Sequence, residues 1–300
     1  MIRISNLQLP LDHDDQALSQ AIVARLSIQA DDLLDYVVHR RGYDARKKSK
    51  IVLIYALDVT TNQDDQLLAT FTGDQLIKIS PDMSYKFVAQ APVMVTDRPI
   101  VIGFGPCGLL IGLVLAQMGY KPIILERGAA VRQRTKDTFG FWRKKILNTE
   151  SNVQFGEGGA GTFSDGKLYS QVKDLNHYSR KVLAEFVAAG APEEILFVSK
   201  PHIGTFRLVS MVEKMRATIE ELGGEVRFDT RVDDVHIDDG QMTGVTLADG
   251  QVLKSRHVAL AIGHSARDTF KMLFDKKVYI EAKPFSIGFR IEHPQAQIDK

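Results

Sequence analysis

A glycine-rich turn at Gly103, Gly105 and Gly108 is the part of the sequence whose residue types and spacing point most directly to chemistry. Gly103 permits a tight turn out of a strand, Gly105 lets the backbone approach a diphosphate, and Gly108 allows close packing of a helix on that strand. Pro106 and Cys107 lie within the same turn. The N–H groups and positive dipole end of the following helix attract phosphate. The pattern predicts a dinucleotide site.

An acidic residue follows the glycine turn at the sequence separation that is typical of a dinucleotide site. Glu126 ends a second apolar run and follows Gly108 by 126 − 108 = 18 residues. A carboxylate at this place accepts hydrogen bonds from the hydroxyl groups of a ribose. We expect Glu126, with Arg127 beside it, to contact the cofactor.

The elements around the turn form a βαβ unit. Residues 100–102 are apolar, a helical pattern runs through Leu109, Leu113 and Met118, Gly119 ends it, and residues 123–125 form a second strand. The apolar stretch 99–125 resembles a membrane span at first sight. Its glycines, together with Lys121 and Pro122, fit two short strands around a turn better.

The rest of the chain supports an α/β fold. We expect helices at 130–147, 178–189 and 208–222, and a buried strand at 258–262. Short β-like runs at 225–228, 232–237, 244–247 and 251–253 are separated by the hairpin signals Asp239-Gly240 and Asp249-Gly250. The predicted fold is a Rossmann-like FAD/NAD(P)-binding domain with a β-hairpin insertion.

Residues 1–95 read as a small, separate α/β (ferredoxin-like) N-terminal domain. Strands are expected from Ile2 and at 51–59, with a helix at 16–26 between them. The basic segment from Arg40 to Lys48 is interpreted as a strand edge or turn, and contact with RNA or a protein partner is the alternative. Residues 91–99 read as a linker. The predicted domains are therefore 1–95, 96–272 for cofactor binding, and 273–300 as the start of a substrate or cap domain.

A second glycine-rich stretch spans residues 156–166. Gly158, Gly159 and Gly161 expose backbone N–H groups that suit a flavin or phosphate contact, and the Thr162 hydroxyl is a further donor. A plain surface loop is the alternative interpretation.

The segments 152–168, 200–205 and 263–268 together resemble a family of uncharacterised bacterial FAD-dependent dehydrogenases, within the two-dinucleotide-binding-domain flavoprotein superfamily. The resemblance implies that the first glycine turn and Glu126 hold the ADP half of FAD. It also implies that a short strand at Val232 presents backbone groups to the adenine, and that Gly263 passes near the cofactor. The implied activity is an FAD-dependent oxidoreductase of unidentified substrate, with NAD(P)H as a co-substrate. The glycine turn alone leaves an NAD(P)-only dehydrogenase open.

The catalytic residues are not determined by the sequence, because a flavin carries the redox chemistry itself. Lys167, His202 and His264 are candidates, and each is also compatible with an ordinary loop position. Cys107 is the single cysteine, which excludes a dithiol mechanism. Ser265 and Asp268 are expected to cap a helix.

Two further expectations concern the end of the chain. Arg290, Glu292 and His293 are expected on one face of a strand at 285–293, as a polar sheet face or a pocket lining. We also expect the flavin domain to be completed by a later segment, which the sequence up to Lys300 does not contain.

The composition limits the classes of partner. Lys plus Arg is 38 and Asp plus Glu is 37, a balance that does not suit a general polyanion binder. The N-terminus lacks the layout of a signal peptide, and no metal-ligand cluster is apparent. We expect a soluble, cytoplasmic protein with a small-molecule substrate, no membrane span, no nucleic-acid partner, and assembly as a homo-oligomer.

Overall fold

The computed structural model describes residues 1–47, 49–164, 166–168, 172–284, 287–289 and 291–299. Lys48 of the basic segment, Asp165 of the second glycine stretch, and Phe285 and Arg290 of the expected last strand lie outside the described residues. The contacts of the chain divide it into two units, Met1–Ser265 and Ala266–Lys300. The predicted boundaries after residues 95 and 272 remain predictions.

The first part of the chain forms an antiparallel sheet in the order β2-β3-β1-β4. Chain order βαββαβ together with this strand order is the ferredoxin-like arrangement, as predicted. Alternate residues such as Ile4 on β1 and Leu57 on β3 face the same side, pair across the sheet, and are fully buried with Ile22 of α1. The elements are β1 (Ile2–Pro10), α1 (Ala17–Leu26), η1 (Ala30–Asp32), β2 (Leu33–Asp44), β3 (Val52–Thr61), α2 (Asp64–Thr70) and β4 (Ile77–Ile79).

Residues Arg40 to Asp44 of the basic segment belong to β2, the edge strand of this sheet. The Arg41 N–H donates to the Phe197 carbonyl (2.7 Å), and the Ser199 N–H donates to the Arg41 carbonyl (2.9 Å). The interpretation as a strand edge is therefore confirmed, and part of that edge is covered by main-chain pairing.

A parallel sheet in the order β11-β5-β6-β7 positions the first glycine turn. Its strands are β5 (Ile100–Ile102), β6 (Ile123–Leu125), β7 (Glu225–Arg227) and β11 (Val258–Leu260). Val101 pairs with Ile124 on one side and with Ala259 on the other. Short apolar strands are expected here, because a parallel sheet is covered on both faces.

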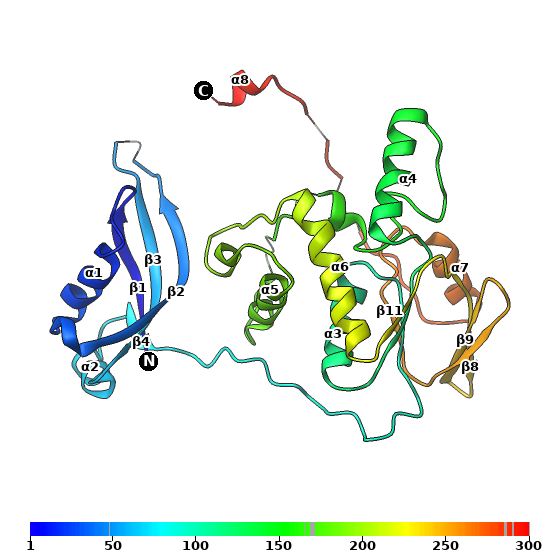
Figure 1. Cartoon of the computed structure of the whole chain (residues 1–300), viewed down its shortest axis with the longest axis horizontal. Coiled ribbons are helices and arrows are strands. Elements are labelled where there is room, and N and C mark those ends of the chain that lie inside the picture. The colour runs from blue at the N-terminus through cyan, green and yellow to red at the C-terminus, as the bar shows by residue number, and fades with distance from the viewer. Residues whose placement is uncertain (48, 165, 169–171, 285–286, 290, 300) are drawn as a thin grey trace. The chain divides into compact units, whose positions relative to one another are not determined.

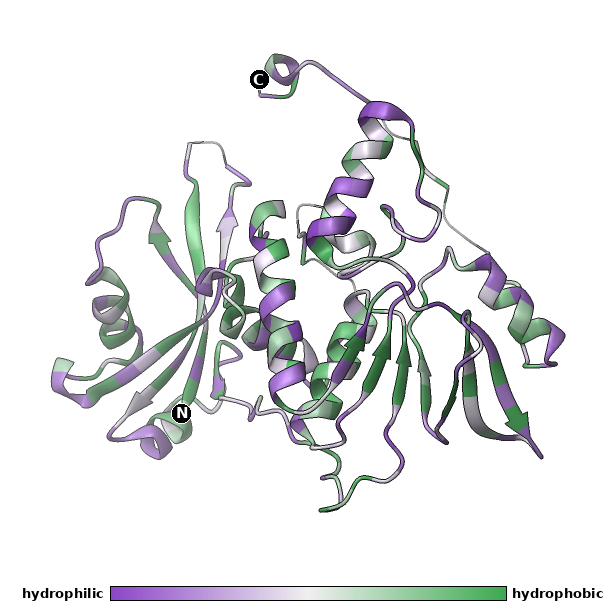
Figure 2. Cartoon of the chain, turned by 45° about the vertical axis from the view of Figure 1, so that its right-hand side comes forward, coloured by the Kyte–Doolittle hydropathy of each residue, from purple (hydrophilic) through white to green (hydrophobic). Residues whose placement is uncertain are grey.

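Helices cover one face of the parallel sheet, and a second, small antiparallel sheet covers the other. Helices α3 (Pro106–Gln117) and α6 (Thr205–Glu221) pack together on one side of the parallel sheet, and the β10-β9-β8 sheet lies on the other side (Figures 1 and 2). The remaining elements of this unit are α4 (Val131–Lys144), η2 (Ala160–Phe163), α5 (Tyr178–Ala188), η3 (Glu193–Leu196), β8 (Val232–Asp238), β9 (Gln241–Leu247) and β10 (Val252–Lys254).

One strand assignment needs correction. Residues 225–228 were expected to belong to the hairpin-rich stretch, but β7 pairs in parallel with β6, with Val226 opposite Ile124. Val226 and Phe228 pack against the hydrophobic core that includes residues of α6. Burial of these two side chains explains why the strand joins the parallel sheet. The hairpin insertion begins at β8. Its turn at Asp239 and Gly240 has positive φ at both residues (+50° and +77°), as the sequence predicted.

The second unit contains α7 (Arg267–Asp275) and α8 (Gln295–Ile298). The described residues between 285 and 293 form no strand, so that prediction is wrong for Glu292 and His293. Alternation of polar and apolar residues there has no neighbouring strand with which to pair. Among the residues that the structure covers, no helix is long and apolar enough to cross a bilayer.

Candidate functional site

The first glycine turn is built as its sequence predicts. A Cβ on Gly103, whose φ is +95°, would lie 2.5 Å from the Ala261 carbonyl oxygen. A Cβ on Gly108 would lie 1.9 Å from the Gly103 carbonyl oxygen. Both distances are shorter than atoms tolerate, so the turn closes only with glycine at these positions. Gly105 differs, because the nearest atom to its Cβ position is a backbone atom of Gly159 at 3.5 Å.

The beginning of α3 is open to an anion. Gly105 is its N-cap, Pro106 occupies the first turn, and no side chain caps the helix. The N–H groups of Cys107 and Gly108 therefore receive no side-chain acceptor, which is the arrangement that binds phosphate at a helix N-terminus. The Cys107 thiol is exposed and free.

Glu126 joins the two glycine-rich segments. Its side chain is buried, with the residue only 4% exposed. One carboxylate oxygen accepts the Phe104 N–H (2.7 Å), and the other accepts the N–H groups of Gly128 (2.8 Å) and Gly156 (2.9 Å). A carboxylate offers about four lone-pair positions, so these bonds leave about one free. The ribose contact predicted for Glu126 remains a prediction that this geometry permits.

The second glycine stretch lies against the first turn. The prediction that Gly158 and Gly159 expose N–H groups to the cofactor is wrong, because Gly158 donates to the Phe104 carbonyl (2.9 Å) and Gly159 donates to the Gly156 carbonyl (3.0 Å). A Cβ on Gly159 would lie 2.8 Å from Gly105 Cα and 2.9 Å from Pro106 Cδ. Gly156, Gly158 and Gly159 all have positive φ, which explains why the segment is rich in glycine.

The two segments together fit the diphosphate of a dinucleotide. Within the described part of the chain, no acceptor is found for the N–H groups of Ala160 and Gly161 at the beginning of η2. A Cβ on Gly161 would lie 3.5 Å from Pro106 Cγ, so these donors lie beside the beginning of α3. Unpaired N–H groups from two loops, with few side chains between them, match an anionic ligand. The residues present therefore fit FAD.

Arg134 is a buried residue of the site that the sequence interpretation missed. It lies in the first turns of α4, is 0% exposed, and donates to backbone carbonyls of the second glycine segment. Burial lowers the pKa of Arg134 to about 10, although the nearby carboxylates of Glu126 and Glu157 act in the opposite direction. A signal was available, because Val131, Arg134 and Thr138 follow the i, i+3, i+7 spacing of a buried helical stripe.

Glu157 was missed as well. It is fully buried, and one carboxylate oxygen accepts the Val131 N–H (2.7 Å) at the beginning of α4. Arg216 Nε lies 3.4 Å from the other oxygen. Burial raises the pKa of Glu157. Its position between Gly156 and Gly158 links α4 and α6 to the second glycine segment.

Other predicted contact residues take defined places. Arg127 forms an ion pair with Glu150 (2.8 Å) and stacks on Phe155, with 4.4 Å from the guanidinium carbon to the ring centre. Val232 begins β8 and is buried, and Gly263 has a φ of +70° with open space at its Cβ position. Thr162 is buried, and its hydroxyl oxygen lies 3.3 Å from Arg134 Nη1.

The catalytic candidates separate into two groups. Lys167 and His202 are brought together as the two residues of an antiparallel bridge, and both side chains are exposed. His264 is also exposed, and its Nδ1 lies 2.8 Å from Ser265 Oγ. The capping prediction for Ser265 is wrong, because Ala266 is the N-cap of α7 and no side chain caps that helix. Ser265 Oγ instead donates to the Gln154 side chain (3.1 Å).

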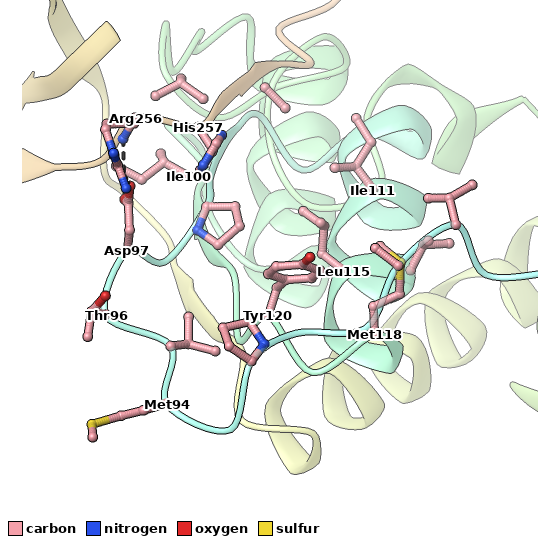
Figure 3. Close-up of a pocket in the computed structure, with 18 of the residues that line it drawn as sticks. Met94, Thr96, Asp97, Ile100, Ile111, Leu115, Met118, Tyr120, Arg256 and His257 are labelled. Atoms are coloured by element: carbon pink, nitrogen blue, oxygen red, sulfur yellow. Dashed lines mark hydrogen bonds and ion pairs between the residues drawn. The ribbon is translucent and has the colours of Figure 1, made fainter.

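A separate apolar groove of about 1050 Å³ lies between α3 and the 88–99 segment (Figure 3). Ile111, Leu115 and Met118 of the α3 region form one wall, and residues of the 88–99 segment form another. Arg256 is the single Lys or Arg among the described lining residues, and it is paired with Asp97 (2.8 Å). A diphosphate needs unpaired donors, so the glycine segments suit a dinucleotide better than this groove does.

Comparison with known proteins finds two families that match parts of the chain. Residues 147–284 match the family described as flavin containing amine oxidoreductase, and residues 1–60 match a domain of unknown function (DUF8436). A protein of Clostridium beijerinckii, named only as uncharacterized, is 41% identical over 298 residues. The match covers 99% of this chain and 55% of that protein, so the chain spans about half the length of its relative.

Two solved structures are also similar. THI4 of Thermovibrio ammonificans shares 18% identity over 61% of this chain and 63% of its own, with a TM-score of 0.41. L-proline dehydrogenase from P. horikoshii shares 16% identity over 60% of this chain and 56% of its own, with a TM-score of 0.39. The family match over residues 147–284 supports a flavin-dependent oxidoreductase and FAD as the cofactor for that part of the chain.

Proposed function

We propose that this chain is the FAD-binding part of a dehydrogenase that acts on a small molecule and exchanges electrons with NAD(P)H. The observation that carries the proposal is Glu126, whose buried carboxylate holds the two glycine segments together beside unpaired N–H groups. Bound FAD supplies the hydride and electron transfer chemistry, and the protein supplies binding and orientation.

The proposed roles follow from the positions of the residues. The N–H groups of Cys107, Gly108, Ala160 and Gly161 are donors for the diphosphate, and Glu126 keeps an acceptor for the ribose. Val232 and Gly263 are proposed to contact the adenine and the flavin half. The exposed side chains of Lys167, His202 and His264 are the candidates that face a substrate.

The decisive experiment is spectroscopic. The purified protein should be yellow, with the absorption bands of bound flavin, and releasing the ligand by heat should yield FAD. Anaerobic stopped-flow mixing with NADH and with NADPH then measures which nicotinamide reduces the flavin. A colourless protein that binds NAD but does not bind FAD would instead support an NAD(P)-only dehydrogenase.

The proposal includes a homo-oligomer and no nucleic-acid partner. Part of the positive charge of the basic segment is balanced locally, because Arg46 forms an ion pair with Asp44 (2.6 Å). Light scattering coupled to size exclusion measures the oligomeric state. RNA binding that weakens with salt and disappears in an Arg46→Ala, Lys47→Ala variant would overturn this part of the proposal.

A further inference from the structure

Arg134 makes an unusual number of contacts with one short segment. Its Nε donates to the Asn152 carbonyl (2.8 Å), and Nη2 donates to the Val153 carbonyl (2.8 Å). Its Nη1 donates to the carbonyls of Glu157 (2.7 Å) and Gly159 (2.8 Å). The planar guanidinium is thus surrounded by four main-chain acceptors from residues 152–159, a set that only arginine can satisfy at once.

The loop is shaped around this side chain. A Cβ on Gly156, whose φ is +116°, would lie 2.3 Å from Arg134 Cδ, so glycine is needed where the arginine stem passes. The ring of Phe163 covers the guanidinium, with its centre 4.9 Å from the guanidinium carbon. The side chain is therefore enclosed by the loop, which fixes the direction of several peptide groups.

The orientation of these peptide groups affects cofactor binding, because the C=O and N–H of one trans peptide point in opposite directions. A carbonyl that faces Arg134 therefore places the N–H of the same peptide on the opposite side. The Glu157 carbonyl faces Arg134, and the Gly158 N–H on the other side of that peptide donates to Phe104 in the first glycine turn (2.9 Å). The Gly159 carbonyl also faces Arg134, so the Ala160 N–H of the same peptide points away from the arginine. Gly159 itself lies against Gly105 and Pro106.

We propose that Arg134 is the positioning residue that turns two peptide groups of this loop, so that the Gly158 N–H faces the first glycine turn and the Ala160 N–H faces the FAD diphosphate. Arg134 does not touch the cofactor in this role. The inference rests on the proposed function, because it assigns the residue that prepares the same site for FAD.

The test compares FAD binding by the full chain and its Arg134→Met and Arg134→Lys variants. Methionine removes every donor, and lysine keeps the charge but offers three donors without the planar fork. By analogy with residues that orient metal ligands, whose loss costs about 10- to 100-fold in affinity, we expect Arg134→Met to weaken FAD binding by about 30-fold and Arg134→Lys by about 10-fold or less. The dissociation constant is measured by titrating the apoprotein with FAD.

Two controls separate positioning from general loss of stability. Arg132→Met changes an exposed arginine of the same helix that pairs with Glu213 (2.7 Å), and Ile219→Ala makes a cavity in the core. We expect Arg132→Met to leave FAD affinity unchanged, and Ile219→Ala to lower the melting temperature without shifting the ³¹P resonances of bound FAD. The Arg134 variants should shift those resonances, because the donors around the diphosphate are turned.

The outcomes are distinguishable. If the wild-type chain does not bind FAD, the proposed function itself fails. If the wild type binds FAD and Arg134→Lys and Arg134→Met bind it as tightly, with unchanged ³¹P resonances, the inference is overturned while the proposed function stands. If Arg134→Met does not fold, Arg134→Lys alone decides between these results.

Discussion

The two glycine segments need their glycines for different reasons. In the first, Gly103 and Gly108 are required by atoms of the turn and its own strand neighbours, at 2.5 Å and 1.9 Å from the missing Cβ atoms. In the second, Gly156 is required by the side chain of Arg134, which begins 22 residues earlier (156 − 134 = 22) in another element. The first turn is thus specified by backbone atoms, from within the turn at Gly108 and from Ala261 at Gly103, whereas Gly156 of the second segment is specified by a side chain from α4.

This difference teaches what a glycine pattern means in a sequence. A turn whose glycines are needed by nearby backbone has a fixed spacing that can be recognised. A loop whose glycines make room for a buried arginine has no such spacing, because its geometry depends on where α4 places Arg134. Glu126 connects the two segments, since its carboxylate accepts hydrogen bonds from N–H groups of both.

The largest effect is expected from Glu126→Ala, which removes the acceptor that both segments share. Three buried N–H groups would lose a charged partner, and each such bond contributes about 1.5–3 kcal/mol, so we expect the free energy of unfolding to fall by about 4.5 kcal/mol or more, with no FAD binding. Urea denaturation measures the change. Glu150→Ala, which breaks partly exposed ion pairs, should cost at most about 1 kcal/mol. Equal effects of the two variants would contradict the joining role of Glu126.

Gly108→Ala tests the local specification of the first turn. The added Cβ would lie 1.9 Å from the Gly103 carbonyl oxygen, so the turn has to open, at a cost of about 3 kcal/mol. The matched control is Gly140→Ala, where nothing lies within 4 Å of the Cβ position inside α4. That control should stabilise the protein by roughly 0.5–1 kcal/mol. Thermal unfolding measures the stability of both variants. A lower melting temperature for Gly108→Ala and a higher one for Gly140→Ala would show that the steric clash at Gly108 outweighs the better helix propensity of alanine.

Gly159 and Gly161 sharpen the comparison inside the second segment. Gly159 has a φ of +59° and its Cβ would lie 2.8 Å from Gly105 Cα, whereas the Cβ of Gly161 meets its nearest atom at an ordinary 3.5 Å. We expect Gly159→Ala to displace the loop and to weaken FAD binding about tenfold, since its φ of +59° and ψ of −166° lie in a region essentially restricted to glycine, where another residue costs about 1–3 kcal/mol. Gly161→Ala should bind FAD nearly as the wild type does. Similar dissociation constants for the two variants would show that contact with Gly105 is unimportant.

The smallest effect concerns His39, which lies in β2 outside both glycine segments. Burial, and then the charge of Arg3, lowers the pKa of His39 to about 4. The unfolded chain takes up this proton near pH 6.5, so the stabilising effect of a neutral His39 is present above that pH and is lost as the pH falls toward 4. Because the residue is half-buried, we expect a loss of about 1–2 kcal/mol over this range. His39→Gln should flatten the plot of melting temperature against pH, and an unchanged plot would contradict this cause.

Most elements were predictable because their patterns are local. The strands at 100–102 and 123–125, the helix ended by Gly119, and the Asp239-Gly240 turn follow from apolar runs and from glycines with positive φ (+86° at Gly119). The ferredoxin-like arrangement of the first domain was predicted as well, although its sheet order depends on long-range pairing.

The failures have a common physical cause. The capping of α7 by Ser265 and the strand at 285–293 were inferred from short patterns that other contacts override or do not support. Arg134 and Glu157 were missed because a charged residue in a helix or loop is usually solvated, and only the assembled fold shows both to be fully buried. Whether such a charged side chain is buried depends on partners that are distant in sequence.

Because Glu126 accepts N–H groups from both glycine segments and Arg134 occupies the interior of the second, these parts form one transferable unit. An engineer who transplanted residues 152–163 alone into another dinucleotide-binding protein would move a loop without its scaffold. A successful graft has to carry the glutamate at the end of the strand and the first turns of helix α4 together with the loop.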